Sequence, residues 1–129
     1  GDIFQGRDAV RILKWTGADM AMIGRGSFGN PWIFQSALAA IDGLDEPPGP
    51  DINQRVETAL RQFSLAAQYK SERVACLEAR KHFAWYLKGV PHSSAYKNRI
   101  SSLSSLQEAR EIGREIKENY GWRKAAGER

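Results

Sequence analysis

Gly24-Arg25-Gly26 offers the most specific chemistry in the sequence, because it follows a short apolar run and precedes a helix signal. Glycine lets the backbone approach an anion closely, and the N–H groups of such a turn can bind phosphate oxygens. The arginine can add a charge-assisted hydrogen bond. The turns after the seventh and eighth strands of β/α barrels have this form. A plain strand-to-helix turn with an exposed arginine also fits, since Gly-x-Gly alone is common.

A second group of candidate residues is basic and lies between residues 70 and 99. This stretch holds seven Lys or Arg residues and two Glu residues, a net charge of +5, whereas the whole chain carries +4. Tyr86 and Tyr96 lie among them, and such mixtures suit RNA backbone and unstacked bases. A solvated helix face is the alternative. The candidate RNA contacts are Lys81, Lys88, Lys97, Arg99 and Arg80, of which Arg80 could instead pair with an acid inside the fold.

Other reactive residue types point to packing. Cys76 is the single cysteine, which excludes an internal disulfide and predicts a small core residue. His82 and His92 have no second ligand at metal spacing, so we expect packing roles and no metal. The aromatic side chains at 32, 34, 83 and 85 are also expected to pack. No apolar run has membrane-span length, so no membrane partner is expected.

The elements that position the glycine turn belong to the first third of the chain. We predict a helix over residues 8–15 closed by Gly17, then a buried strand over 18–23. A second helix over 32–40 should be capped by Asn30, with Pro31 at its first position. From this order of helix, strand and helix, we predict that residues 1–41 form the last β/α elements of a barrel. Residues 42–50 are acidic and proline-rich, which predicts a linker.

The remainder predicts an all-α domain over residues 51–122. The apolar spacing indicates helices over 51–69, 74–88 and 95–100, with Val56, Leu60 and Phe63 facing inward from the first of them. Leu77, Ala84 and Leu87 are the inner positions expected of the second, which Gly89 ends. A last helix should begin at Ser104 or Ser105 with a capping box and end at Gly121. Its predicted inner residues are Leu106, Ala109, Ile116 and Tyr120, and residues 123–129 are expected to fray.

The number of elements also bears on the fold class. A closed TIM-type α/β barrel needs about 250 residues, and one or two β/α units cannot close a sheet. We therefore expect the C-terminal fragment of such a barrel, mostly helical overall, with the other strands before Gly1. On this prediction residues 1–40 lack their sheet neighbours. The start has neither an initiator Met nor a signal peptide, so we expect a cytoplasmic protein that lacks its N-terminal part.

Several motifs together resemble a known family. They are Thr-Gly-Ala-Asp at 16–19, Met-Ile-Gly-Arg-Gly at 22–26, Gly-Asn-Pro-Trp-Ile-Phe at 29–34, Arg-Lys-His-Phe-Ala-Trp-Tyr-Leu-Lys-Gly at 80–89 and Asn-Arg-Ile at 98–100. The set is similar to the C-terminal part of bacterial tRNA-dihydrouridine synthases, most closely the B-type subgroup historically linked to a nitrogen-regulation operon. The resemblance covers most of residues 1–120 and is more specific than any single motif.

The resemblance implies an enzyme that uses FMN and NADPH to reduce the C5–C6 double bond of uridine in tRNA. Gly1 and Asp2 would end one turn of the FMN site, Gly24 and Arg25 would hold the FMN phosphate, and the helical domain would hold tRNA. Hydride would pass from the flavin to the pyrimidine while a cysteine protonates the neighbouring carbon. In this family that cysteine and the lysine and histidine at the flavin lie upstream. We therefore assign no catalytic residue and expect no turnover from this chain alone.

Two alternatives stay open at this stage. One is another phosphate-binding barrel enzyme with an unrelated helical tail, and the other is a stand-alone helical module that binds RNA or protein. The basic residues between 80 and 99 favour the dihydrouridine synthase over the other barrel enzyme. A yellow colour of the complete protein would separate the synthase from both alternatives. The sequence does not specify an oligomeric state.

Overall fold

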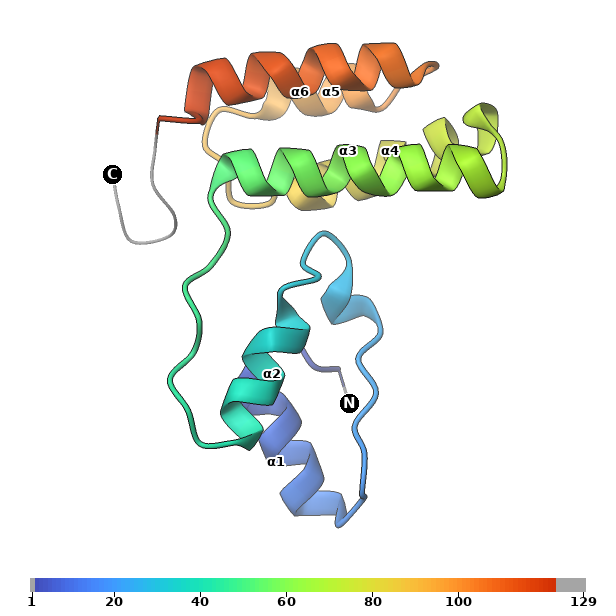
Figure 1. Ribbon diagram of the computed structural model, residues 1–129. Coiled ribbons are helices and arrows are strands. Elements are labelled where there is room, and N and C mark those ends of the chain that lie inside the picture. Colours follow the sequence, from blue (N-terminus) through green and yellow to red (C-terminus); the bar gives the residue numbers. More distant parts are fainter. Residues whose placement is uncertain (1, 123–129) are drawn as a thin grey trace. The chain divides into compact units, whose positions relative to one another are not determined.

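The computed structural model describes residues 2–122 and divides the chain into two compact units, Gly1–Gly49 and Pro50–Arg129 (Figure 1). Within the described residues, the first unit holds helix α1, a short 3-10 helix η1 and helix α2. The second unit holds helices α3 to α6. Gly1 and the predicted frayed tail at 123–129 lie outside the described residues.

Helix α1 spans Gly6–Thr16 and starts two residues before the predicted position. The Asp8 carboxylate explains this start, because it accepts hydrogen bonds from the backbone N–H groups of Phe4 at 3.1 Å and Gln5 at 3.0 Å. These bonds lower the pKa of Asp8, the Phe4 bond most strongly. The predicted stop at Gly17 is confirmed, since Gly17 has a φ of 69° and its N–H bonds to the Leu13 carbonyl.

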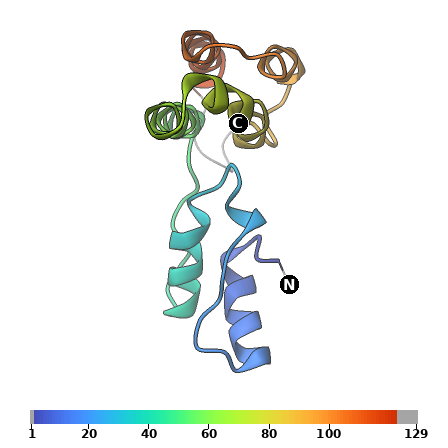
Figure 2. The same cartoon turned by 90° about the vertical axis from the view of Figure 1, so that its right-hand side faces the viewer.

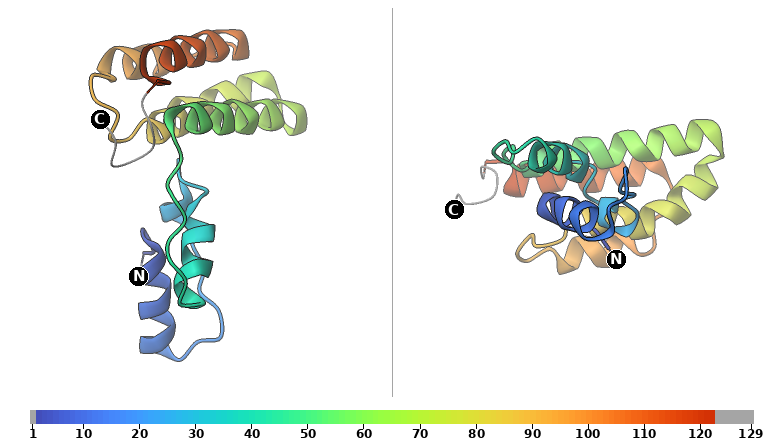
Figure 3. Two further views of the ribbon diagram at one scale, coloured as in Figure 1. Left: turned by 60° about the vertical axis from the view of Figure 1, so that its left-hand side comes forward. Right: turned by 90° about the horizontal axis from the view of Figure 1, so that it is seen from below.

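Helix α2 spans Ile33–Ile41 and packs side by side with α1 (Figures 1 and 3). The two helices approach so closely at Gly6 that an added Cβ would lie 2.4 Å from the Ser36 carbonyl oxygen. The predicted Asn30 side-chain cap is wrong. Trp32 occupies the cap position, and the Asn30 backbone carbonyl accepts from the Ile33 N–H at 3.2 Å instead.

The predicted strand over residues 18–23 does not form, because no part of the described chain supplies a backbone hydrogen-bonding ladder to it. The side chains nevertheless alternate as in a strand. Ala21 and Ile23 pack against the small core of the first unit, which Ile3, Ala9, Ile33 and Ala37 form. Met20 and Met22 face outward, 85% and 89% exposed.

Residues 44–51 contain neither helix nor strand, and the boundary between the two units falls after Gly49. Helix α2 ends just before this segment, where Gly43 adopts a φ of 70°. Three prolines and the acidic side chains favour an irregular backbone here.

The second unit is a ring of four helices, in which each helix packs against two others. They are α3 (Ile52–Tyr69), α4 (Glu72–Tyr86), α5 (Ser94–Ile100) and α6 (Leu106–Tyr120), and Figure 2 views α3 and α6 nearly end-on. The rings of Phe63 and Phe83 meet at the centre, 5.4 Å apart. The predicted inner residues Val56 and Ile116 are fully buried, whereas Leu77 is 46% exposed and was wrongly placed inside.

The starts of the long helices follow capping chemistry. An Asp51 carboxylate oxygen accepts from the Gln54 N–H at 2.8 Å. The Ser105 hydroxyl oxygen accepts from the Glu108 N–H at 3.1 Å, which confirms the predicted cap of the last helix, whereas the return bond of the predicted capping box does not form among the described residues. Helix α4 begins earlier than predicted because the Ser71 hydroxyl oxygen caps it through the Val74 N–H at 3.1 Å.

Candidate phosphate and nucleic-acid sites

The glycine turn forms a 3-10 helix, η1, over Arg25–Ser27. The Gly24 carbonyl accepts hydrogen bonds from the Ser27 N–H at 3.0 Å and from the Ser27 hydroxyl at 2.8 Å. The Phe28 N–H bonds to the Arg25 carbonyl at 3.1 Å. The turn's own bonds therefore do not use the N–H groups of Arg25 and Gly26.

The two glycines of this turn have different surroundings. A Cβ on Gly24 would meet nothing within 4 Å, so this side of the turn is open to a ligand. A Cβ on Gly26 would lie 1.7 Å from the Ile3 carbonyl oxygen. The segment around Ile3 therefore lies directly on the turn, and only glycine permits this approach.

This close approach brings Asp2 beside Arg25. The Arg25 Nε donates to one Asp2 carboxylate oxygen at 3.2 Å, and the guanidinium also donates to the other oxygen. The two side chains are 71% and 37% exposed. Two of the predicted cofactor residues, 23 positions apart in sequence, thus form one arrangement, while Gly1 lies outside the described residues.

The arrangement fits a phosphate group. It offers an exposed guanidinium, an open backbone at Gly24 and two turn N–H groups outside the turn's own hydrogen bonds. Because a carboxylate repels a phosphate, Asp2 does not bind the phosphate itself. Its role in this arrangement is to hold the Arg25 guanidinium by hydrogen bonds. The chemistry of these groups is anion binding, and none of them is placed to act as a nucleophile.

The five candidate RNA contacts divide into two classes. Lys81 and Lys88 are exposed and Lys97 is half-buried, and within the described residues none of the three has an acidic partner at ion-pair distance. Arg80 and Arg99 instead bond inside the unit. Three lysines therefore remain as cations open to a nucleic-acid phosphate.

The two arginines tie helices together. The Arg80 Nε donates to the Leu103 carbonyl at 3.0 Å, a backbone partner in place of the acid that the sequence suggested. Arg99 donates to both carboxylate oxygens of Glu115, at 3.0 Å and 2.8 Å, and so joins α5 to α6. This bidentate bond raises the pKa of Arg99 and lowers the pKa of Glu115.

Arg55 is a residue near this surface that the sequence did not single out. Its guanidinium donates to the Lys88 carbonyl at 3.1 Å, and burial lowers the pKa of Arg55. The bond holds the turn after α4, and with it Lys88, against α3. The sequence around Arg55 does not predict this bond, because a basic residue in an amphipathic helix is ordinarily exposed to solvent.

Helix α4 presents apolar side chains beside the exposed lysines. Val74, Leu77 and Trp85 are 37%, 46% and 38% exposed, and with Lys81 they follow helical spacing on one stripe. Trp85 is thus only partly a packing residue. An aromatic face beside Lys81 can stack on an unpaired base while the ammonium group meets phosphate.

The histidine and cysteine of α4 have structural surroundings. The His82 ring meets the Trp85 ring edge-on at 5.0 Å, and burial lowers the pKa of His82. Cys76 is 2% exposed and burial raises the pKa of its thiol, which confirms a small core residue. The described residues hold no cluster of three His, Cys, Asp or Glu side chains suited to a metal ion.

None of the described helices combines the length and apolar character needed to cross a membrane.

Comparison with known proteins gives a consistent result. The family model described as "Dihydrouridine synthase (Dus)" matches residues 1–120. A probable tRNA-dihydrouridine synthase of Mycobacterium leprae is 35% identical over 108 residues, which cover 84% of this chain and 28% of the relative. A tRNA-dihydrouridine synthase B of Pasteurella multocida is 32% identical over 108 residues, 84% of this chain and 32% of the relative. The chain therefore spans about a third of the length of these relatives.

Proposed function

Because the chain belongs to the dihydrouridine synthase family, we propose that it forms the C-terminal part of an enzyme that reduces uridine to 5,6-dihydrouridine in tRNA. The named relatives, all of them longer, support this activity for the whole protein. On this proposal the whole protein contains a TIM-type barrel, belongs to the B-type subgroup and works in the cytoplasm. Residues 1–41 supply barrel elements, and residues 51–122 supply the domain that holds tRNA.

The glycine turn holds the phosphate of FMN on this proposal. Gly24 and Arg25 bind the phosphate oxygens, Asp2 fixes the Arg25 guanidinium, and Gly1 adjoins the same site. The open side of Gly24 and the exposure of Arg25 support these roles. When bound, the flavin supplies the hydride, and NADPH then reduces the flavin again.

The helical unit holds tRNA through its basic surface. Lys81, Lys88 and Lys97 contact phosphates, and Trp85 lies beside Lys81 where a base can stack. Arg80 and Arg99 belong to the same surface, and their internal bonds keep α4, α5 and α6 in register. Such contacts supply affinity and salt dependence rather than sequence choice.

The observation that carries the tRNA proposal is that three lysines have no acidic partner among the described residues and lie within the part of the chain that the family model covers. A direct test is the binding of labelled tRNA to this chain over a salt series. We expect the triple variant Lys81→Ala, Lys88→Ala, Lys97→Ala to bind at least about tenfold more weakly at low salt. The slope of its log affinity against log salt concentration should be smaller in magnitude by about two, because each lost phosphate contact removes roughly 0.7 to 0.9 from that slope.

The matched control is the triple variant Arg61→Gln, Arg110→Gln, Arg114→Gln. It removes the same charge from exposed positions of α3 and α6 and should retain most of the affinity. Equal losses in both variants would show that only net charge matters and would contradict the proposed surface.

A further inference from the structure

We propose that helix α1 carries a second RNA-backbone contact, formed by Arg7, Arg11 and Lys14 with the exposed ring of Trp15. This inference rests on the proposed function, because it concerns the same tRNA partner. It adds a contact on the unit that otherwise provides only the phosphate turn.

The spacing of these cations places them on one face of α1. Positions 7, 11 and 14 are separated by four and three residues, which puts them within an arc of about 60° on an α-helix. At roughly 1.5 Å per residue they extend over about 10 Å along the helix. That length matches about three nucleotides of one strand at roughly 3.4 Å each.

The charges of the first unit are segregated, which distinguishes this face from a generally basic surface. Residues 1–49 contain four basic and six acidic side chains, so the unit is acidic as a whole. Three of its four basic side chains nevertheless lie on this face, while the fourth, Arg25, is bonded to Asp2. Of the six acids, Asp19 lies in the loop after α1, and three lie at positions 42, 45 and 46, after α2.

Three acidic side chains come near the stripe, and one of them, Glu46, lines a second hollow together with Arg7. Arg11 contacts Asp8 at 3.3 Å but stays 72% exposed, and the Asp8 carboxylate also accepts two backbone hydrogen bonds. Asp2 lines the same surface hollow but is bonded to Arg25. Arg7 and Lys14 have no ion-pair partner within the part of the chain that the structure describes. The stripe therefore keeps two cations that form no ion pair within the described residues.

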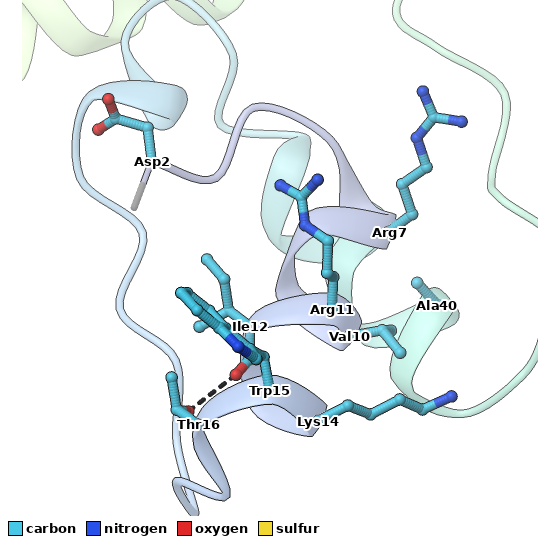
Figure 4. Close-up of a pocket in the computed structure, with 9 residues that line it drawn as sticks. All are labelled: Asp2, Arg7, Val10, Arg11, Ile12, Lys14, Trp15, Thr16 and Ala40. Atoms are coloured by element: carbon cyan, nitrogen blue, oxygen red, sulfur yellow. Dashed lines mark hydrogen bonds between the residues drawn. The ribbon is translucent and has the colours of Figure 1, made fainter.

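Trp15 completes the surface. Its side chain is 86% exposed and lines, with the three cations, a shallow hollow of about 1070 Å³. Figure 4 shows the long side chains of Arg7, Arg11 and Lys14 reaching outward from α1 around this hollow. Val10, Ile12 and Ala40 also line the hollow, but all three are half-buried, whereas the exposed side chains other than Trp15 are polar or charged. One aromatic ring among spaced cations fits a nucleic-acid strand.

The test is the same tRNA titration over a salt series, made with the whole protein that contains this chain, in which we expect residues 1–49 to be folded. The triple variant Arg7→Gln, Arg11→Gln, Lys14→Gln should weaken binding about three- to tenfold at low salt and lower the salt slope by about two. The Trp15→Ala variant should weaken binding without changing the salt slope. Circular dichroism of each variant should match the parent, since all four side chains are exposed.

Four outcomes separate this inference from the proposed function. Losses in both the α1 variant and the Lys81, Lys88, Lys97 variant support both surfaces. Loss in the Lys81, Lys88, Lys97 variant alone overturns the α1 surface and leaves the proposed function intact. An equal loss in the Arg61, Arg110, Arg114 control overturns the α1 surface as a specific contact. No binding by the whole parent protein at low salt overturns both the tRNA-holding role of this chain and the inference that rests on it.

Discussion

The surroundings of His82 lower the pKa of its side chain. Burial lowers its pKa most strongly, Lys70 and Lys81 act in the same direction, and Glu78 opposes them. The folded protein therefore binds a proton at His82 less readily than the unfolded chain, in which histidine titrates near about 6.5. The stabilisation of the neutral ring is fully present above that pH, and it decreases as the pH falls below it.

We expect the free energy of unfolding to fall between about pH 7.5 and pH 5.5, and to fall less in a His82→Gln variant. Urea denaturation of both proteins at the two pH values measures the difference. A His92→Gln variant, which removes the other histidine at an exposed turn, is the control and should retain the parent's pH dependence. The same pH dependence in parent and His82→Gln would contradict the role of His82 burial.

At the residue scale, the sequence predicted which residues belong to the candidate sites more reliably than it predicted which partners they bond to. Asp2 and Arg25, both expected at one site through the family resemblance, are indeed bonded to each other. Arg99 was expected on the open surface, and Arg80 either there or paired with an internal acid. The two arginines instead bond to Glu115 and to the Leu103 carbonyl, which lie 16 and 23 positions away. Such pairings depend on how helices pack, which local sequence does not specify.

Single hydrogen bonds at the starts of the long helices contribute to their stability. The Ser105 hydroxyl oxygen accepts from the Glu108 N–H, and this bond satisfies one of the amide groups that a helix start leaves without a helical partner. The sequence left two starts open, Ser104 and Ser105. The structure selects Ser105, whose side chain is half-buried, while that of Ser104 is exposed.

A Ser105→Ala substitution should therefore lower the free energy of unfolding of the helical unit by about 1 kcal/mol. Ser104→Ala is a closely matched control, because it removes the same hydroxyl one residue earlier and should change stability by less than about 0.5 kcal/mol. Chemical denaturation followed by circular dichroism gives both values. A larger effect at Ser104 than at Ser105 would show that the cap is wrongly assigned.

At the element scale, prediction succeeded at Gly17 and Ser105, where the determining interactions are local, although the equally local Asn30 cap of α2 does not form. The ends at Gly17 and Ser105 follow from left-handed backbone at the first and side-chain capping at the second, both within a few residues. The strand over 18–23 was predicted from its apolar pattern, but a strand requires a hydrogen-bonded neighbour. Half-buried Ala21 and Ile23 alternate with exposed Met20 and Met22, as in a strand, and a hydrogen-bonded neighbour is what the described chain lacks.

The two units differ in how much core each one has. The helical unit buries Phe63, Phe83, Leu87, Ile112 and several further apolar side chains within its own four helices. The first unit has a core cluster of four buried residues, two of them alanines, and it exposes Trp15, Met20 and Met22. Burial of apolar surface is the main source of folding free energy, so the two units should not be equally stable alone.

A chain limited to residues 50–122 should therefore fold by itself, whereas a chain limited to residues 1–49 should not. The first should keep its helical circular dichroism and unfold cooperatively, because its buried side chains come from its own helices. The second should show little helix, since a core of this size cannot offset the entropy of ordering about 50 residues. Its helices should appear only within a longer protein that covers Met20 and Met22. A cooperative unfolding transition in the isolated residues 1–49 would show that α1 and α2 need no such cover, and would remove the physical reason for placing them in a larger barrel.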